Sequence, residues 1–165
     1  MKKFGNKIPT GNVVATNGGS LPCKKVIHAV GPLYTKKGFE CPLLFKRVVG
    51  NSFRVVSIMK MNTIAMPALC SNLYQFPTSI VARLILDEIL HYNHHDFKKQ
   101  IKEFTLIDIN ETRSKILAKE LDKRDFVEGG GLRKSILDEQ DKMLSNDLRV
   151  LIMEEGEGEP IKKGS

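Results

Sequence analysis

The sequence predicts an α/β protein with largely parallel strands. Short runs rich in β-branched and apolar residues alternate with longer segments whose apolar residues recur every three or four positions. The first pattern is typical of strands and the second of helices. Because the connections between these segments are short, their alternation favours strands that run in one direction, with helices packed against the sheet.

The first elements are two strands and a helix. Strands are expected at 11–16 and 25–30, and the Gly-rich residues 17–20 between them have the composition of a turn. Apolar residues at mostly three-to-four spacing then predict a helix over 43–60, although Gly50 weakens its middle. The chain therefore opens with a pair of short strands that a long helix follows.

The following elements repeat the alternation of strand and helix. Pro77 suits a helix entrance, and Asn110 is a plausible helix N-cap. The expected elements are a strand at 63–66, a helix at 77–92, a strand at 104–109 and a helix at 111–121. Beyond these, a helix over 132–144 and a strand over 147–153 complete the predicted order.

Composition narrows the class of protein. The 165 residues are 41% hydrophobic and 27% charged, which is ordinary for about one globular domain. No apolar run approaches the ~20 residues of a membrane span, and the start lacks the apolar stretch of an export signal. The three cysteines, Cys23, Cys41 and Cys70, form no CxxC pattern, which favours reduced thiols in the nucleus, the cytoplasm or both.

The charge of the chain predicts tolerance of anions rather than a nucleic-acid reader. The net charge is +7, and a basic surface attracts polyanions in general. The lysine pairs are spread along the chain, tryptophan is absent, and no basic stripe is interleaved with aromatic residues. We therefore expect neither a specific nucleic-acid partner nor a membrane partner.

The segment 67–77, between an expected strand and an expected helix, is the candidate binding loop. Ligands of α/β sheets sit beyond the carboxyl ends of the strands, where backbone N–H groups and a helix N-terminus can face a phosphate. Ser71 and Tyr74 add hydroxyl groups. The alternative is an ordinary connection in which Leu73 and Phe76 merely cover the core, and spacing alone leaves it open.

Two segments of the chain, 11–34 and 63–77, resemble macro domains, and the resemblance extends over about 7–121. In the first, the stretch from Leu-Pro-Cys-Lys to Ile-His-Ala-Val-Gly-Pro is nearly a signature of that family. In the second, the Gln-Phe-Pro ending is most similar to a macro domain of PARP-like proteins. The resemblance implies a three-layer α/β/α sandwich and recognition of ADP-ribose.

The resemblance also implies a site. In macro domains, backbone amides of the loop wrap the diphosphate and distal ribose of ADP-ribose. Two glycines of that loop are replaced here by Asn72 and Gln75, and Asn72 is expected to hold the left-handed turn. Asp108 and Ile109 are expected near the edge of the adenine pocket. The matching loop positions are Cys70, Ser71, Asn72, Leu73, Tyr74 and Gln75.

Other family features have no match. Macro domains open with a strand carrying an adenine-reading aspartate, an Asn-Ala-Ala-Asn motif and a Gly-rich loop, and only ten residues precede Gly11. The resemblance therefore implies a domain truncated at its N-terminus, with weakened or lost binding. The expected organisation is a partial macro domain at 1–121, a linker at 122–131, a helix–strand extension at 132–153 and an acidic, Gly-rich tail at 154–165.

Three functions remain open. The first is binding of ADP-ribose or ADP-ribosylated proteins. The second is a contact segment of a PARP-like protein, whose partner covers an exposed core, and the third is ADP-ribosyl hydrolysis, which leans on the missing loops. No cofactor or metal is expected, because His91, His94 and His95 suit a polar helix end and His28 suits a structural hydrogen bond. A helix N-terminus near Cys70 would lower the pKa of its thiol, although no catalytic base can be placed beside it.

Overall fold

The computed structural model describes residues 7–34, 40–95, 100–124, 133–135 and 149–154. Within these ranges strands and helices alternate from the second strand to the third helix, so the structure has the α/β class that the sequence predicts. None of the helices in the described part of the chain is long and apolar enough to cross a membrane.

The first two strands form an antiparallel hairpin. β1 (Val13–Asn17) pairs with β2 (Lys25–Ala29), both within about two residues of the expected bounds. Gly18 is required in the turn, because a Cβ at this position would lie 2.0 Å from the carbonyl oxygen of Cys23. The Gly-rich turn of the sequence is therefore a close backbone approach.

The other strands form a parallel sheet. Its order is β3 (Thr63–Met66), β4 (Glu103–Asp108), β6 (Arg149–Glu154) and β5 (Arg133–Ser135). Parallel neighbours need a crossover of a dozen or more residues, and α2 (Thr78–His95) supplies it between β3 and β4. The ends of β3 and β4 consequently meet at one edge of the sheet.

In the C-terminal part, the structure differs from the prediction made from the sequence. The helix expected over 132–144 does not begin there, because Arg133–Ser135 is strand β5, whose backbone pairs with β6. Pairing with a neighbouring strand outweighs a short helical periodicity, which is a weak local preference. The rest of that segment and the tail after 154 lie outside the described residues, so the domain boundaries stay predictions.

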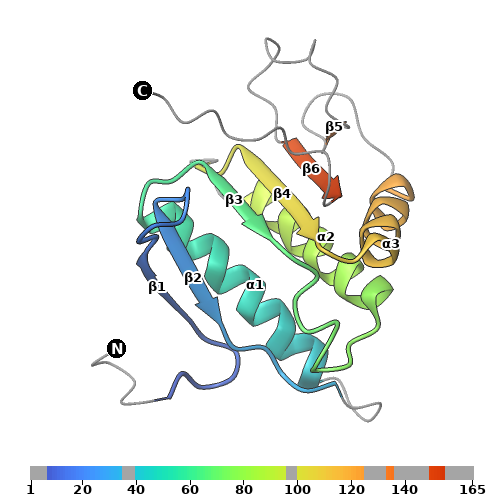
Figure 1. The fold of residues 1–165 in the computed structure, drawn as a ribbon, viewed down its shortest axis with the longest axis horizontal. Coiled ribbons are helices and arrows are strands. Elements are labelled where there is room, and N and C mark those ends of the chain that lie inside the picture. Colours follow the sequence, from blue (N-terminus) through green and yellow to red (C-terminus); the bar gives the residue numbers. More distant parts are fainter. Residues whose placement is uncertain (1–6, 35–39, 96–99, 125–132, 136–148, 155–165) are drawn as a thin grey trace.

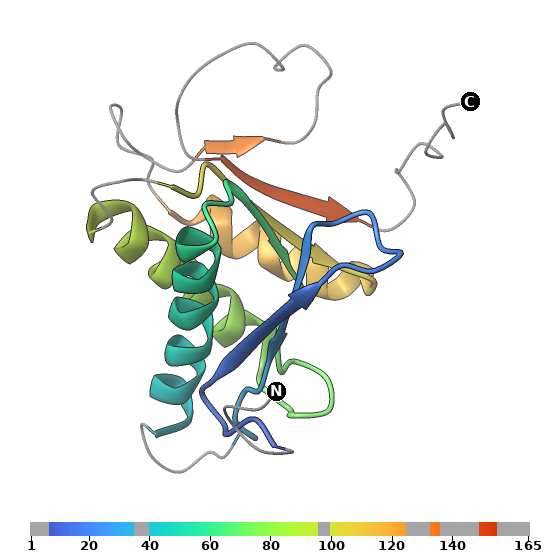
Figure 2. The same cartoon turned by 90° about the vertical axis from the view of Figure 1, so that its left-hand side faces the viewer.

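Helices lie on one side of the two sheets. α1 (Glu40–Ile58) contacts β1, β2, β3 and α2, whereas α3 (Glu111–Asp122) contacts α2, β4 and β6. Figure 1 shows α1 and α2 behind the strands, and Figure 2 shows the hairpin beside α1. The helix α1 therefore joins the hairpin to the parallel sheet. Phenylalanines dominate the fully buried core, namely Phe45, Phe53, Phe76 and Phe104.

The parallel sheet is buried on one face. Along β4, Phe104 and Leu106 are at most 1% exposed, whereas Ile107 between Leu106 and the strand end is 37% exposed. Alternate residues of a strand point to opposite faces, so the helices cover one face and leave the other open among the described residues. Of the three layers that the family resemblance implies, the described residues supply the sheet and one helix layer.

The N-cap of α3 provides a test of the predicted helix start. The side chain of Asn110 accepts a hydrogen bond from the backbone N–H of Arg113 (3.0 Å), as expected of an N-cap. We expect Asn110→Ala to lower the free energy of unfolding by about 1 kcal/mol, measured by urea denaturation. Asn110→Asp keeps the acceptor and serves as the control. Equal stability of Asn110→Ala and the unchanged protein would contradict the capping role.

A candidate ligand-binding loop

The loop 67–77 lies where β2 and β3 both end. The backbone N–H of Tyr34, shortly after β2, donates to the carbonyl oxygen of Tyr74 (2.9 Å). The ring of Tyr34 also packs on Phe76, with ring centroids 4.8 Å apart. Phe76 is 1% exposed and contacts Phe45 of α1 as well. The last part of the loop is thus fixed in the core while its tip faces solvent.

Backbone hydrogen bonds give the loop a compact shape. The N–H of Ser71 donates to Ala68, that of Gln75 to Asn72, and that of Phe76 to Cys70, at 3.0–3.2 Å. By contrast, the N–H groups at positions 72–74 donate no backbone hydrogen bond within the described part of the chain. The tip of the loop therefore offers consecutive N–H donors to an anion.

Two loop residues adopt the left-handed backbone, and Asn72 is not one of them. They are Cys70 (φ 63°) and Gln75 (φ 57°). The expectation for Asn72 is wrong because the hydrogen bonds that close the loop demand the left-handed conformation at its two flanks. Gln75 is one of the two positions at which the family resemblance predicts glycine, which adopts this conformation without steric cost.

The thiol of Cys70 points into a tight contact. A Cβ built on Gly31 would lie 2.2 Å from the Cys70 sulfur, so glycine is the residue that fits opposite it without moving the thiol. Burial raises the pKa of the Cys70 thiol to about 11. The expected lowering by the helix N-terminus is therefore wrong, since desolvation favours the neutral thiol. Cys70 acts as a packing residue and holds the loop against the segment that follows β2.

The two hydroxyl residues of the loop differ. The hydroxyl of Ser71 donates to the carbonyl oxygen of Ala68 at 2.6 Å, so its proton is already committed. Tyr74 is 42% exposed. Leu73 is 85% exposed and does not cover the core, in contrast to Phe76. The ordinary-connection alternative thus describes the end of the loop and not its tip.

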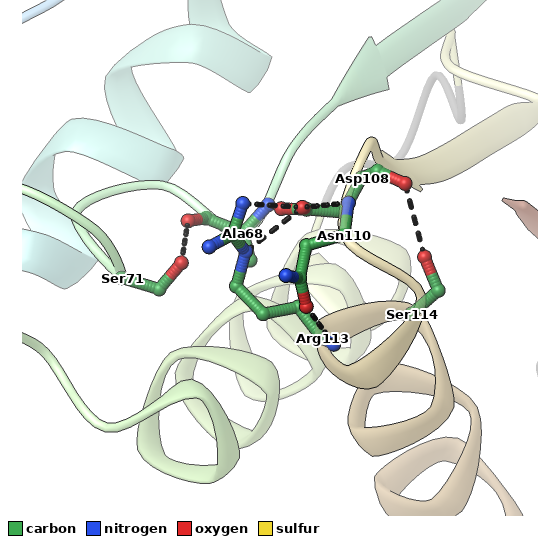
Figure 3. A network of polar contacts seen from close by, with 6 residues as sticks. All are labelled: Ala68, Ser71, Asp108, Asn110, Arg113 and Ser114. Atoms are coloured by element: carbon green, nitrogen blue, oxygen red, sulfur yellow. Dashed lines mark hydrogen bonds and ion pairs between the residues drawn. The ribbon is translucent and has the colours of Figure 1, made fainter. Parts of the chain in front are cut away.

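Asp108, the last residue of β4, is buried beneath the loop (Figure 3). Its Oδ1 accepts from Arg113 Nε (2.8 Å) and from the N–H of Asn110 (3.0 Å), and its Oδ2 accepts from the N–H of Ala68 (3.4 Å). Ile109 is 73% exposed. The structure thus gives the Asp108 carboxylate partners within the protein, and a place for both residues at an adenine pocket stays a prediction.

Comparison with known proteins identifies the fold family. A family model described as the Macro domain matches residues 1–85, just over half of the chain. The chain belongs to the macro domain family. It is 32% identical over 105 residues to the protein mono-ADP-ribosyltransferase PARP9 of Mus musculus, covering 61% of this chain and 12% of that protein. Over 81 residues it is 33% identical to O-acetyl-ADP-ribose deacetylase 1 of Pantoea vagans, covering 49% of this chain and 47% of the deacetylase.

Solved macro domains share the fold. The Trypanosoma brucei macrodomain, crystallised in complex with ADP-ribose, matches with a TM-score of 0.64 at 19% identity, covering 70% of this chain and 47% of that one. The α/β macro fold that the sequence predicts is therefore confirmed. The chain spans about half or less of the length of these relatives, and the predicted truncation of the domain stays a prediction.

Sequence reasoning missed two residues that shape this macro domain loop. Arg113 neutralises Asp108, with Nη2 2.8 Å from Oδ1, and Gly31 leaves space for the Cys70 sulfur. Arg113 could have been found from the sequence, because an acidic residue at a strand end is followed by an arginine in the first turn of the next helix. For Gly31, the only indication in the sequence was the Gly-Pro turn after β2.

The histidines do not form a metal site in the described part of the macro domain. His91 and His95 stack at 4.4 Å on the last turn of α2, but no group of three or more potential ligands occurs among the described residues. His28 contacts Thr16 across the hairpin, with 3.0 Å between Nε2 and Oγ1. The structural hydrogen bond expected for His28 is therefore confirmed.

The raised pKa of the half-buried Cys70 thiol predicts slow alkylation of this residue. A rise of the pKa from 9.0 to about 11 lowers the thiolate fraction at pH 8 by roughly 10²-fold. We expect iodoacetamide to label exposed Cys23 first, measured by peptide mass spectrometry over time. Equal labelling rates at Cys23 and Cys70 would contradict a raised pKa of the Cys70 thiol.

The same shift makes stability depend on pH. Because the pKa of the Cys70 thiol is raised in the folded state, the contribution of this thiol to the free energy of unfolding is fully present below pH 9 and is lost as the pH rises toward 11.

Proposed function

We propose that the chain binds ADP-ribose, free or attached to proteins, through the loop 67–77. The observation that carries the proposal is the loop tip, where consecutive N–H groups at 72–74 make no backbone hydrogen bond within the described chain. The family gives the ligand class, because a macrodomain of the same fold was solved with ADP-ribose bound. The protein is thus proposed as a reader of ADP-ribosylation.

Charge supports binding of a diphosphate at this position. The N-terminus of α2 begins at Thr78, directly after the loop, and helix N-termini stabilise nearby anions. The net charge of +7 adds a general attraction. Asn72 and Gln75 bring side chains where macro domains have glycine, so we propose that the loop holds the diphosphate more weakly than a glycine-containing loop does.

A pair of substitutions at Leu73 tests the site without touching the core. The side chain is 85% exposed, so either charge is tolerated there. We expect Leu73→Glu to weaken and Leu73→Lys to tighten ADP-ribose binding, each by roughly 3–5-fold from Coulomb interaction with the diphosphate near the surface. The measurement is isothermal titration with ADP-ribose, with AMP as the ligand control. Both shifts shrink at high salt.

The titration distinguishes ligand binding at the loop tip from binding elsewhere and from no binding. Saturable heat with opposite shifts for the two Leu73 variants supports a diphosphate site at the loop tip. Equal affinities for both variants place the ligand elsewhere and refute the loop as the site. Absence of heat from folded, unchanged protein refutes the binding proposal and favours the alternative of a protein contact segment.

The contact-segment alternative has one supporting observation. The face of the parallel sheet that carries Ile107 is not covered by a described helix, although the core beneath the other face is closed. Hydrolysis of an ADP-ribose ester, suggested by the deacetylase relative, has less support. Cys70 is a half-buried thiol whose pKa is raised, and the Ser71 hydroxyl donates to Ala68, so neither loop residue offers a prepared nucleophile.

A further inference from the structure

We propose that Asp108 is a positioning residue for the binding loop: its carboxylate holds the backbone of Ala68 and thereby sets the shape of the loop up to its tip. The inference rests on the proposed function for its consequence in ligand affinity. Its structural part rests on the contacts in Figure 3 alone. Asp108 itself does not touch the ligand in this role.

The first step is the carboxylate's use of both oxygens. Oδ2 accepts from the N–H of Ala68, 40 positions away, while Oδ1 accepts from the first turn of α3. Ala68 is 5% exposed, so its N–H has little access to water and needs an acceptor in the protein. One side chain therefore ties the ends of β3 and β4 to the start of α3.

The second step passes from Ala68 into the loop. The carbonyl oxygen of Ala68 accepts both the hydroxyl (2.6 Å) and the N–H (3.2 Å) of Ser71. Both backbone groups of Ala68 are thus held, one by Asp108 and the other by Ser71. The next hydrogen bond, from the N–H of Phe76 to the carbonyl oxygen of Cys70, closes the loop around its tip. Loss of the hydrogen bond from Ala68 to Asp108 therefore removes the first of this series of hydrogen bonds.

The third step explains why the residue is an aspartate with an arginine beside it. Every group that faces the two oxygens is a donor, and only a carboxylate accepts on both sides. An unpaired buried carboxylate below a phosphate site would repel the ligand. The guanidinium of Arg113, with Nε and Nη2 both 2.8 Å from Oδ1, neutralises that charge.

The test compares three variants by amide hydrogen exchange. Asp108→Ala removes both acceptors. The isosteric Asp108→Asn keeps the volume and one acceptor, which the two donors on the Oδ1 side, Arg113 and the N–H of Asn110, hold, so its NH2 group faces the N–H of Ala68 and cannot accept from it. The control, Ser114→Ala, removes a buried hydrogen bond to the Asp108 carbonyl oxygen (3.1 Å) at the same corner but leaves the carboxylate in place. The reporters are the loop amides of Ser71 and Phe76, normalised to the amide of Leu86 in α2, which corrects for changes in global stability.

We expect the normalised exchange of the loop amides to rise at least about tenfold in both Asp108 variants and to stay unchanged in Ser114→Ala. Unchanged loop exchange in Asp108→Asn overturns the proposal, and this variant decides the matter where Asp108→Ala fails to fold. Equal loosening in Ser114→Ala also overturns it, because general weakening of the corner then explains the effect.

Titration with ADP-ribose separates this inference from the proposed function. Where the unchanged protein binds, we expect Asp108→Asn to lose about tenfold in affinity, equivalent to about 1.4 kcal/mol, and Ser114→Ala to bind normally. Full affinity in Asp108→Asn refutes the positioning role in binding. Absence of binding by the unchanged protein refutes the proposed function, and the exchange measurement alone then judges Asp108.

Discussion

Parallel pairing of β3 with β4 is the constraint on which the candidate site depends. Thr63 lies opposite Glu103 and Met66 opposite Leu106, so both strands end at the same edge of the sheet. The chain must cross from one strand to the next by way of α2, and it leaves β3 through the loop 67–77. The carboxyl end of β4 therefore arrives directly below the start of that loop, which brings Asp108 to Ala68.

The loop combines a fixed base with an open tip. Phe76 lies in the aromatic core between Tyr34 and Phe45, and Ala68 is buried at the other end. Between them Leu73 stands out into solvent. A loop held at both ends loses little conformational freedom when a ligand binds, which reduces the entropic cost of association. The loop is fixed by long-range contacts, namely the packing of Phe76 on Tyr34 and Phe45 and the hydrogen bond from Ala68 to Asp108.

Local patterns were sufficient for most of the fold. The strand at 63–66 and the N-cap Asn110 follow from apolar runs, proline positions and capping chemistry, all of which act over a few residues. The short strand β5 was not predictable, because it exists through pairing with β6, 16 positions further along the chain. A strand of three residues has no periodicity of its own to read.

The position of the loop 67–77 between a strand and a helix was predictable, but its internal geometry was not. The order of strand, loop and helix indicated where 67–77 lies, and the family resemblance indicated the ligand class. The contacts of Asp108 and Cys70 could not be predicted, because their partners Ala68 and Gly31 are about 40 positions away in sequence. The left-handed conformation at Cys70 and Gln75 likewise follows from loop closure and not from the preference of either residue.

The contact between Gly31 and Cys70 also constrains which substitutions the two positions can accept during evolution. A Cβ at position 31 would overlap the sulfur at position 70, so a larger residue at position 31 requires the Cys70 side chain to move or to become smaller. Because Cys70 has a left-handed backbone, glycine is the replacement that its conformation accepts most readily. The two positions are therefore coupled: a glycine gained at position 70 would remove the overlap that a side chain at position 31 creates.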